Sequence, residues 1–376
     1  MRHFALQSNR VITPEGMIAA CVEIKDDVIH AIHPFGSALD CPIEDLTDKV
    51  LMPGLVDSHV HINEPGRTEW EGFNTATQAA AAGGITTLVD MPLNCIPVTT
   101  TKAAFMEKLA SVTDKLWVDC GFWGGVIPDN IEQLDELLSA GVFGVKSFLI
   151  DSGIEEFPNV EAKDIRLAMP IIAKHKVPYL IHAELDCGTN EEISIEESAI
   201  GDSYQKFLES RPKKWENEAI DLMIDLTRES RERGHDVSVH IVHLSSDEAL
   251  EKIANAKLEG MTFTAETCPH YLTIASENIP PGKTLFKCCP PIRENKNREH
   301  LWQAIKDRVI SFIVSDHSPC TPQLKNIDSG DIEKAWGGIS ALQFGLPLIW
   351  TEAEPRGFSL EDISRLMSLE TAKLLD

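Results

Sequence analysis

The sequence contains no run of about eighteen consecutive apolar residues, the length that a membrane-spanning helix needs. It also lacks a secretory signal, because residues 1–6 lead directly into polar residues 7–9 without an apolar core or a small-residue cleavage site. Its nine cysteines include no Cys-x-x-Cys pair. These absences predict a fold that starts near residue 1, no membrane partner, and reduced cysteines in an intracellular compartment, without disulfides or structural zinc.

Positive charge is scarce as well. The 34 Lys and Arg residues stand against 59 Asp and Glu, which gives a formal net charge of −25. Such a chain repels phosphate backbones, and no local basic patch stands out, so we expect no nucleic-acid partner. With 376 residues, of which 43% are hydrophobic, the chain is long enough for one large α/β domain and a smaller appendage, or for two domains of ordinary size.

Residues 1–50 have the pattern of a small β unit. Short strand-like runs are separated by turn residues, and these runs cover residues 4–6, 10–12, 17–25 and 28–32. A unit with this small number of strands is not stable by itself and should need partners elsewhere in the chain.

From residue 51 onward, short apolar runs alternate with longer helical patterns. The predicted strands are residues 51–58, 84–91, 116–123, 142–149, 177–183, 237–244, 261–268 and 309–315. The predicted helices are residues 74–82, 101–113, 130–140, 160–175, 217–233, 246–258 and 297–306. Eight such units predict an α/β fold, a parallel (β/α)8 TIM-like barrel. The alternative, an open doubly wound sheet, is disfavoured because no Gly-x-Gly-x-x-Gly follows the first strand.

Polar side chains stand at the ends of five of the predicted strands or within them. The carboxyl ends of barrel strands meet at one rim, where barrel enzymes carry their chemistry. His59 and His61 are spaced i and i+2, which places both imidazoles on one face of a strand. The other residues on this rim are Lys146, His182, His243 and Asp316. Their joint placement favours a metal site.

Each of these residues also has a simpler explanation on its own. Lys146 could reach the barrel mouth or pair with a carboxylate, a lone His is often a core residue, and Asp316 could be a helix N-cap. Alternatively, a desolvated neutral Lys146 could take up carbon dioxide as a carbamate whose two oxygens bridge two metal ions. His240 lies three residues before His243 and faces the opposite way on a regular strand, so we interpret it as structural.

The sequence resembles the cyclic amidohydrolase branch of the amidohydrolase superfamily, which includes dihydroorotases, hydantoinases or dihydropyrimidinases, and allantoinases. The residues that carry this resemblance are Met52-Pro53-Gly54-Leu55-Val56-Asp57-Ser58-His59-Val60-His61, Lys146, His182, His243 and Ser315-Asp316-His317-Ser318-Pro319. It implies two zinc ions. His59, His61 and Asp316 would hold the more buried ion, His182 and His243 the second, and carboxylated Lys146 would bridge them.

The resemblance also implies a mechanism and a substrate class. A hydroxide between the two zinc ions would open a cyclic amide, and Asp316 would carry the proton to the leaving ring nitrogen. Dihydroorotases usually have Arg two residues after the second histidine. This sequence has Asn63 there, which argues against a dihydroorotase. The segments that look most like allantoinases are residues 63–73, 90–94, 267–271, 290–293 and 334–339, although Trp70 and Trp336 could be core aromatics.

An allantoinase-like enzyme would convert allantoin to allantoate in purine catabolism, and hydantoinase or dihydropyrimidinase activity is the alternative. The resemblance implies that the ring is held by Asn94, Cys289, Gly338 and Ile339. It further implies a homo-oligomer, a tetramer in the full-length family form. The expected location is intracellular, the cytoplasm first, with peroxisome and mitochondrion as alternatives.

Family members continue past the last barrel helix with a glycine-punctuated β segment that completes the small sandwich. This sequence ends at Asp376, before such a segment. We therefore expect a partial small β-sandwich domain in residues 1–50, with its C-terminal half missing, and a metal-dependent barrel in residues 51–376. A truncated isoform of reduced stability, inactive or acting as a metal-free scaffold, is the other class of function to weigh.

Overall fold

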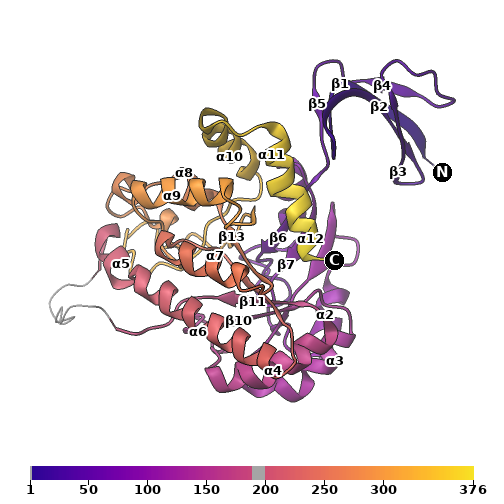
Figure 1. The fold of residues 1–376 in the computed structure, drawn as a ribbon. Coiled ribbons are helices and arrows are strands. Elements are labelled where there is room, and N and C mark those ends of the chain that lie inside the picture. Colours follow the sequence, from indigo (N-terminus) through magenta and orange to yellow (C-terminus); the bar gives the residue numbers. More distant parts are fainter. Residues whose placement is uncertain (1, 189–199) are drawn as a thin grey trace.

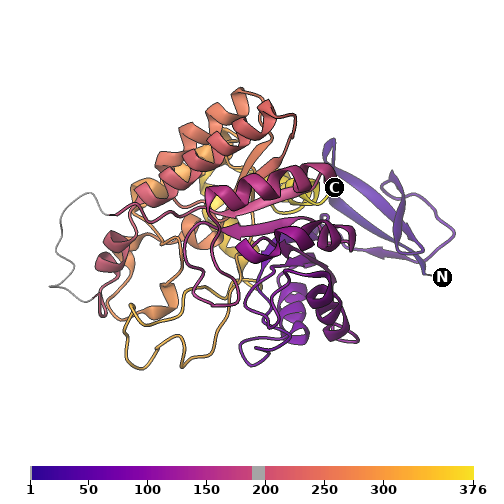
Figure 2. The same cartoon turned by 90° about the horizontal axis from the view of Figure 1, so that it is seen from below.

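The computed structural model describes residues 2–188 and 200–376. It has an N-terminal β-sheet and a barrel of parallel strands wrapped by helices (Figure 1). Turned by 90°, the molecule again shows the N-terminal sheet projecting from one side of the barrel (Figure 2). Within the described ranges, none of the helices combines the length and the apolar character that crossing a membrane requires.

The N-terminal sheet has five strands in the order β3-β2-β1-β4, with β5 also paired to β1. Strand β1 is antiparallel to β2, β2 is antiparallel to β3, and both β4 and β5 run parallel to β1. Val11, Ala20 and Val22 form a small apolar cluster in it, with Leu51 packed against them. The strands are β1 (His3–Thr13), β2 (Gly16–Lys25), β3 (Val28–Pro34), β4 (Ile43–Asp45) and β5 (Val50–Leu51).

The first predicted strands differ from the structure at one place. Residues 4–6 and 10–12 belong to one continuous strand, β1, whose register against β2 shifts between Ser8 and Val11. Ser8 is buried, and its hydroxyl donates to the carbonyl of Lys49 at 2.5 Å and accepts the N–H of Arg10 at 2.9 Å. The polar residues therefore make a β-bulge, not a turn.

Eight parallel strand positions form the barrel, as the sequence predicted. The ring closes where Val60 bridges His317 and the N–H of His61 donates to the carbonyl of His317 at 2.7 Å. The predicted third strand is divided into β8 and β9 around Trp123. The strands are β6 (Leu55–Val60), β7 (Ile85–Asp90), β8 (Asp119–Phe122), β9 (Gly124–Gly125), β10 (Val145–Phe148), β11 (Pro178–His182), β12 (Ser238–Ile241), β13 (Phe263–Thr267) and β14 (Phe312–Ile313).

The predicted strand over residues 51–58 is divided between the two sheets. Its first residue ends β5 in the N-terminal sheet, and β6 of the barrel begins only at Leu55. Pro53 lies between them and has no N–H to give to a ladder. The domain boundary between residues 50 and 51 stays a prediction.

Helices cover the outside of the barrel, and the seven predicted ones are present. They are α1 (Phe73–Ala82), α2 (Lys102–Ser111), α3 (Leu134–Ser139), α4 (Ala162–His175), α6 (Lys213–Glu232), α7 (Leu250–Leu258) and α9 (Asn295–Lys306). The predicted starts of α3 and α7 are 3-10 turns, η1 (Pro128–Gln133) and η3 (Asp247–Ala249). Helix α6 shows why the sequence folds this way, because Ala219, Ile220, Met223 and Ile224 recur at helical spacing and are buried.

Several short elements were not predicted. They are α5 (Tyr204–Ser210), α8 (Pro269–Thr273), η4 (Ser276–Asn278), η5 (Thr284–Phe286), α10 (Gly345–Ala353), η6 (Glu354–Arg356), α11 (Leu360–Ser364), a π-helical turn η7 (Arg365–Leu369) and α12 (Glu370–Leu374). The last three run as one helical segment beside the N-terminal sheet in Figure 1. The short elements over residues 269–286 lie in the connections that surround the barrel mouth.

A buried ion pair joins α2 to the end of β7. Lys108 pairs with Asp90, both side chains are inaccessible to water, and the second oxygen of Asp90 accepts the N–H of Ile62 at 2.7 Å. Burial raises the pKa of Asp90 to about 6, because the Lys108 charge and the hydrogen bonds offset only part of the desolvation. The pair therefore holds strand β7 and the segment after β6 against helix α2.

We expect Lys108→Ala to destabilise the fold by about 3–5 kcal/mol, because it leaves the Asp90 carboxylate buried without a counter-charge. The matched control is Lys102→Ala on the same helix, whose exposed pair with Glu136 should change stability by less than about 1 kcal/mol. Urea unfolding followed by circular dichroism measures both. Equal losses in the two variants would contradict the importance of the buried pair.

Candidate metal centre and active site

All six residues that the sequence placed at the barrel rim lie together in one buried group. His59 is the next-to-last residue of β6 and His61 directly follows its end, Lys146 lies in β10, His182 ends β11, and His243 and Asp316 follow β12 and β14. Nε2 of His59 lies 3.1 Å from Oδ1 of Asp316 and 3.2 Å from Nζ of Lys146. The ring of His243 is 5.4 Å from that of His59 and 4.6 Å from that of His182.

The nearest ligand atoms already have the spacing of a metal site. His59, His61 and Asp316 each offer one such atom, and these atoms lie within 4.8 Å of one another. The two histidine rings are 5.5 Å apart, on the same side of the strand end, as the i and i+2 spacing predicted. This group could hold a metal ion.

Two of the six residues and one residue of a neighbouring loop have backbone angles that are unusual for residues other than glycine. His243 has φ of 39° and Asp316 has φ of 46°, and Asn94 in the neighbouring loop has φ of 61°. Left-handed angles of this kind are uncommon and cost free energy, which the surrounding structure must offset. They turn the chain sharply at the strand ends, where the site is built.

Fixed acceptors orient the histidine rings. Nδ1 of His59 lies 2.5 Å from Oε1 of Glu266, and Nε2 of His182 lies 2.9 Å from Oε2 of Glu184. Nδ1 of His61 lies 3.3 Å from the carbonyl of Leu93. Because a carboxylate or a carbonyl only accepts, each of these nitrogens donates, and in His61 and His182 the opposite nitrogen keeps its lone pair for a metal. Burial and Lys146 would lower the pKa of His59, but Asp316 and Glu266 raise it above the usual value, because Nε2 of His59 faces the Asp316 carboxylate.

Two of the histidines and the carboxylate are in protonation states that suit metal binding. Burial lowers the pKa of His61 and of His243 well below the usual value, so both rings are neutral. Burial alone would raise the pKa of Asp316, but His59, His243 and His61 bring it well below its usual range, so this residue is a carboxylate. Neutral imidazoles and a carboxylate are the forms that bind metal ions.

Lys146 is the least ordinary member of the group. It is fully buried, and among residues 2–188 and 200–376 it forms no ion pair with a carboxylate. Burial lowers its pKa to about 8, against the opposing effect of Asp316 and Glu266. A neutral amine is therefore accessible near neutral pH, and this is the form that reacts with carbon dioxide.

A second buried group lies beside the first. Cys268, His270 and Asp316 offer ligand atoms within 4.8 Å of one another, and neither ring nitrogen of His270 has a hydrogen-bond partner in the described part of the chain. Burial lowers the pKa of His270 to about 4, so the ring is neutral. His270 lies in the segment 267–271 that looks like allantoinases, but sequence analysis assigned no role to this residue.

A cavity of about 670 Å³ opens above the six residues. Of the predicted substrate contacts, Asn94, Cys289 and Gly338 line it, whereas Ile339 is not among its lining residues. Trp336 also lines the cavity and packs edge-on against Trp70, with ring centroids 5.1 Å apart. Trp336 is therefore a wall of the site and not only a core aromatic.

A buried lysine holds two of the cavity walls together. Nζ of Lys325 donates to the carbonyls of Lys287 at 3.1 Å, of Trp336 at 2.8 Å and of Gly338. Gly338 has φ of 121°, and a side chain there would collide with the carbonyl of Ser318. This tight loop keeps the backbone beside Cys289 at the cavity edge.

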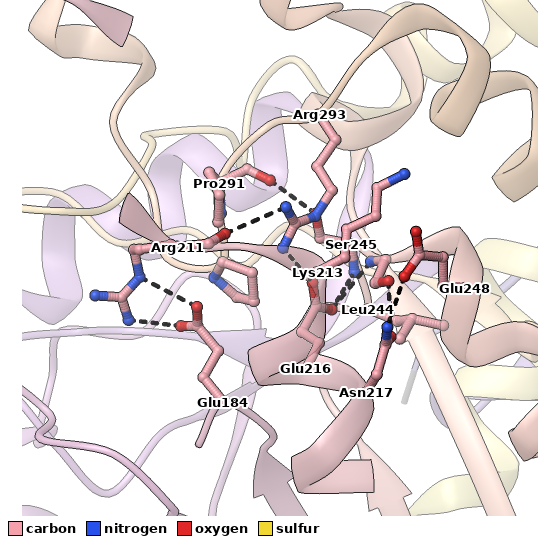
Figure 3. A network of polar contacts seen from close by, with 12 residues as sticks. Glu184, Arg211, Lys213, Glu216, Asn217, Leu244, Ser245, Glu248, Pro291 and Arg293 are labelled. Atoms are coloured by element: carbon pink, nitrogen blue, oxygen red, sulfur yellow. Dashed lines mark hydrogen bonds and ion pairs between the residues drawn. The ribbon is translucent and has the colours of Figure 1, made fainter. Parts of the chain in front are cut away.

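A polar network supports the opposite wall (Figure 3). Arg211 lines the cavity and forms a bidentate pair with Glu184 at 3.1 and 2.7 Å, the same carboxylate that holds His182. Arg293 donates to the carbonyl of Arg211 at 3.3 Å and to Glu216 at 2.9 Å. Glu216 in turn accepts the N–H of Ser245, two residues after His243, at 2.9 Å.

Sequence reasoning missed this supporting layer, namely Glu184, Arg211, Glu266, His270 and Lys325. Glu184 and Glu266 carry a usable signal, since each is a carboxylate in or beside an apolar strand. His240, interpreted as structural, donates from Nε2 to Glu266 at 3.1 Å and stacks on Phe312. It therefore belongs to the layer behind His59.

The orientation of His59 should depend on Glu266. We expect Glu266→Gln to weaken metal binding by about 10- to 100-fold, because the amide is a poorer acceptor for the ring N–H. Competition with a chromogenic chelator measures the affinity. The control is Glu277→Gln, a carboxylate outside the barrel core, and an unchanged affinity in Glu266→Gln would contradict the orienting role.

The fold and the buried cluster agree with the comparisons with known proteins. The profile of the amidohydrolase family matches residues 50–376. The chain is 49% identical over 373 residues to the mitochondrial allantoinase of Aquarana catesbeiana, covering 98% of this chain and 75% of that protein. It is 49% identical over 372 residues to the allantoinase of Streptomyces avermitilis, covering 98% and 81%.

The fold is also that of solved members of the same group. The L-hydantoinase (dihydropyrimidinase) of Arthrobacter aurescens superimposes with a TM-score of 0.92 at 28% identity, covering 100% of this chain and 82% of that one. The dihydropyrimidinase of Brevibacillus agri gives 0.87 at 25% identity, covering 100% and 82%.

The chain belongs to the amidohydrolase family, in its cyclic amidohydrolase branch. Within that branch it is a homologue of the allantoinases.

Proposed function

We propose that this chain hydrolyses the cyclic amide of allantoin to give allantoate, as an enzyme with two zinc ions. The observation that carries the proposal is the buried convergence of His59, His61, Lys146, His182, His243 and Asp316 beneath the large cavity. The identity of 49% to proteins named allantoinase supports the choice of substrate.

The donor set fits two ions that share one bridging ligand. His59, His61 and Asp316 would hold one ion, and His182 and His243 would hold the other. A carbamate on Lys146 would supply an oxygen to each and would replace a buried, unpaired ammonium with a coordinated anion, which removes the cost of burying it. Zinc ions bound there would supply a water that is deprotonated near neutral pH and would polarise the carbonyl to be attacked.

Asp316 is the residue that would move the proton. Its carboxylate lies in the middle of the group, 3.1 Å from His59 and 3.7 Å from His61, and its low pKa keeps it ionised. It would take a proton from the attacking water and deliver it to the ring nitrogen as the carbon–nitrogen bond breaks. A group that first accepts the proton and then delivers it must stay within reach of the water oxygen and of the ring nitrogen. The loop after β14 would hold Asp316 in such a position.

Backbone and side-chain groups of the cavity wall would hold the ring and its ureido substituent. Asn94, Cys289 and Gly338 are in position to do so, since each lines the cavity. Ile339 is not among the lining residues, and its carbonyl already accepts the N–H of Ser318 at 3.0 Å, so the cavity supports the other three contacts better than this one. Arg211 and Lys287 add hydrogen-bond donors to the same space.

The substrate can be tested against the hydantoinase alternative, which the close match to solved hydantoinases favours. We expect kcat/KM for allantoin to exceed that for hydantoin and dihydrouracil by about tenfold or more, because a polar wall penalises a substrate without the ureido group. A ring-opening assay with the three substrates measures this. Faster turnover of hydantoin would reverse the assignment.

The metal content tests the mechanism and the scaffold alternative together. We expect about two zinc ions per chain in the barrel, and Lys146→Ala should lose both the metal and the activity, since the bridging ligand is gone. Mass spectrometry of the metals provides the count. Full occupancy in Lys146→Ala would contradict the carbamate bridge, and a chain that binds no metal would point to a scaffold.

The role of Asp316 has its own test. We expect Asp316→Asn to keep the fold and to lose about 10²- to 10⁴-fold in kcat, the range that general acid–base catalysis contributes. Circular dichroism checks the fold and the allantoin assay the rate. A near-normal rate would remove Asp316 from the proton path.

A further inference from the structure

One face of the N-terminal sheet carries a group of metal-binding side chains far from the barrel rim. Glu23 in β2 lies opposite Ala5 in β1 and opposite Ala31 in β3. Since side chains alternate along a strand, His3 and His33, each two residues along from those alanines, share the face of Glu23. Figure 1 shows this sheet standing to the side of the barrel.

The side chains converge closely. Nε2 of His3 lies 2.7 Å from Oε1 of Glu23, and Nε2 of His33 lies 2.7 Å from Oε2. Cys41, between β3 and β4, completes the group, because ligand atoms of His3, Glu23 and Cys41 lie within 4.8 Å of one another. The side chains of His3, Glu23 and His33 are 33%, 13% and 29% exposed, so an ion can reach them from solvent.

The group lacks a fixed positive charge. In the described part of the chain, Glu23 forms ion pairs only with His3 and His33, which carry charge only when protonated. Lys25 lies opposite His3 but forms no ion pair with Glu23 in the described part of the chain, so the carboxylate and the Cys41 thiol lie close together without a paired Lys or Arg, and a divalent cation would supply the missing charge.

We propose that His3, Glu23 and Cys41 bind a zinc ion, with a water as the fourth ligand and His33 donating to the free oxygen of Glu23. One nitrogen, one oxygen and one sulfur ligand suit zinc, and an open fourth position is common where a site is exposed. A histidine that holds the second carboxylate oxygen is the usual kind of support for such a ligand.

The geometry needs only a small adjustment. Zinc–ligand distances of about 2.0–2.3 Å in a tetrahedron place the ligand atoms about 3.4 Å apart. His3 and Glu23 are now at hydrogen-bond distance, 2.7 Å, so their side chains would move apart by less than about 1 Å on entry of the ion. The ion would join β1, β2 and the segment before β4.

Metal counting on the full chain tests the site. The protein with its barrel metals loaded is equilibrated with zinc and counted by native mass spectrometry, and we expect one ion more than the barrel holds. Cys41→Ser and His3→Ala should each lose that ion, with affinity falling by tenfold or more. The control Cys187→Ser changes an exposed cysteine elsewhere and should keep it.

The two sites can be told apart. Allantoin hydrolysis should be unchanged in Cys41→Ser, and replacing zinc with cobalt should give a thiolate charge-transfer band that Cys41→Ser loses and Cys187→Ser keeps. If the barrel binds no metal, the ion at this second site can still be counted, and its loss in Cys41→Ser would support the site independently of the proposed function. No extra ion in the unmodified chain, or an extra ion that survives both Cys41→Ser and His3→Ala, would overturn the proposal.

Discussion

The site depends on how the first and last strands of the barrel are joined. Asp57, buried in β6, accepts the N–H of Ser315 at 3.1 Å and the N–H of His59 at 3.1 Å, although Asp57 and Ser315 are 258 positions apart in the chain. One carboxyl group therefore fixes the segment that bears the two histidines against the segment that bears Asp316. Burial raises the pKa of Asp57 to about 6 in spite of these hydrogen bonds, so burying this carboxylate costs free energy.

Behind this joint, carboxylates set the orientation of the rings. Glu266 receives hydrogen bonds from His59 and from His240, and Glu184 receives them from His182 and Arg211. Buried acceptors of this kind are held by other groups before any ion arrives. Preorganised ligands lose little conformational entropy on binding, which favours a tight and specific centre.

The sequence predicted the eight strands and the six rim residues because both depend on local pattern. Apolar runs of strand length recur along the chain, and the polar residues that interrupt or end them are visible one strand at a time. Glu266, Arg211 and Lys325 were missed because their partners come from distant segments. His59 and Glu266, for example, are 207 positions apart. The bulge at Ser8 was missed for a similar reason, since residues 47–49 fill its hydrogen bonds.

The left-handed backbone at residues 94, 243 and 316 also limits how this rim can change in evolution. Asn, Asp and His enter that conformation more readily than branched or bulky residues. An exchange at position 243 or 316 that kept a donor atom but needed an ordinary backbone angle would have to rebuild the loop as well. Ligand chemistry and backbone geometry thus select the same few residue types at these positions. Residues of the surrounding cavity wall are less constrained, and changes of substrate specificity can arise there more easily.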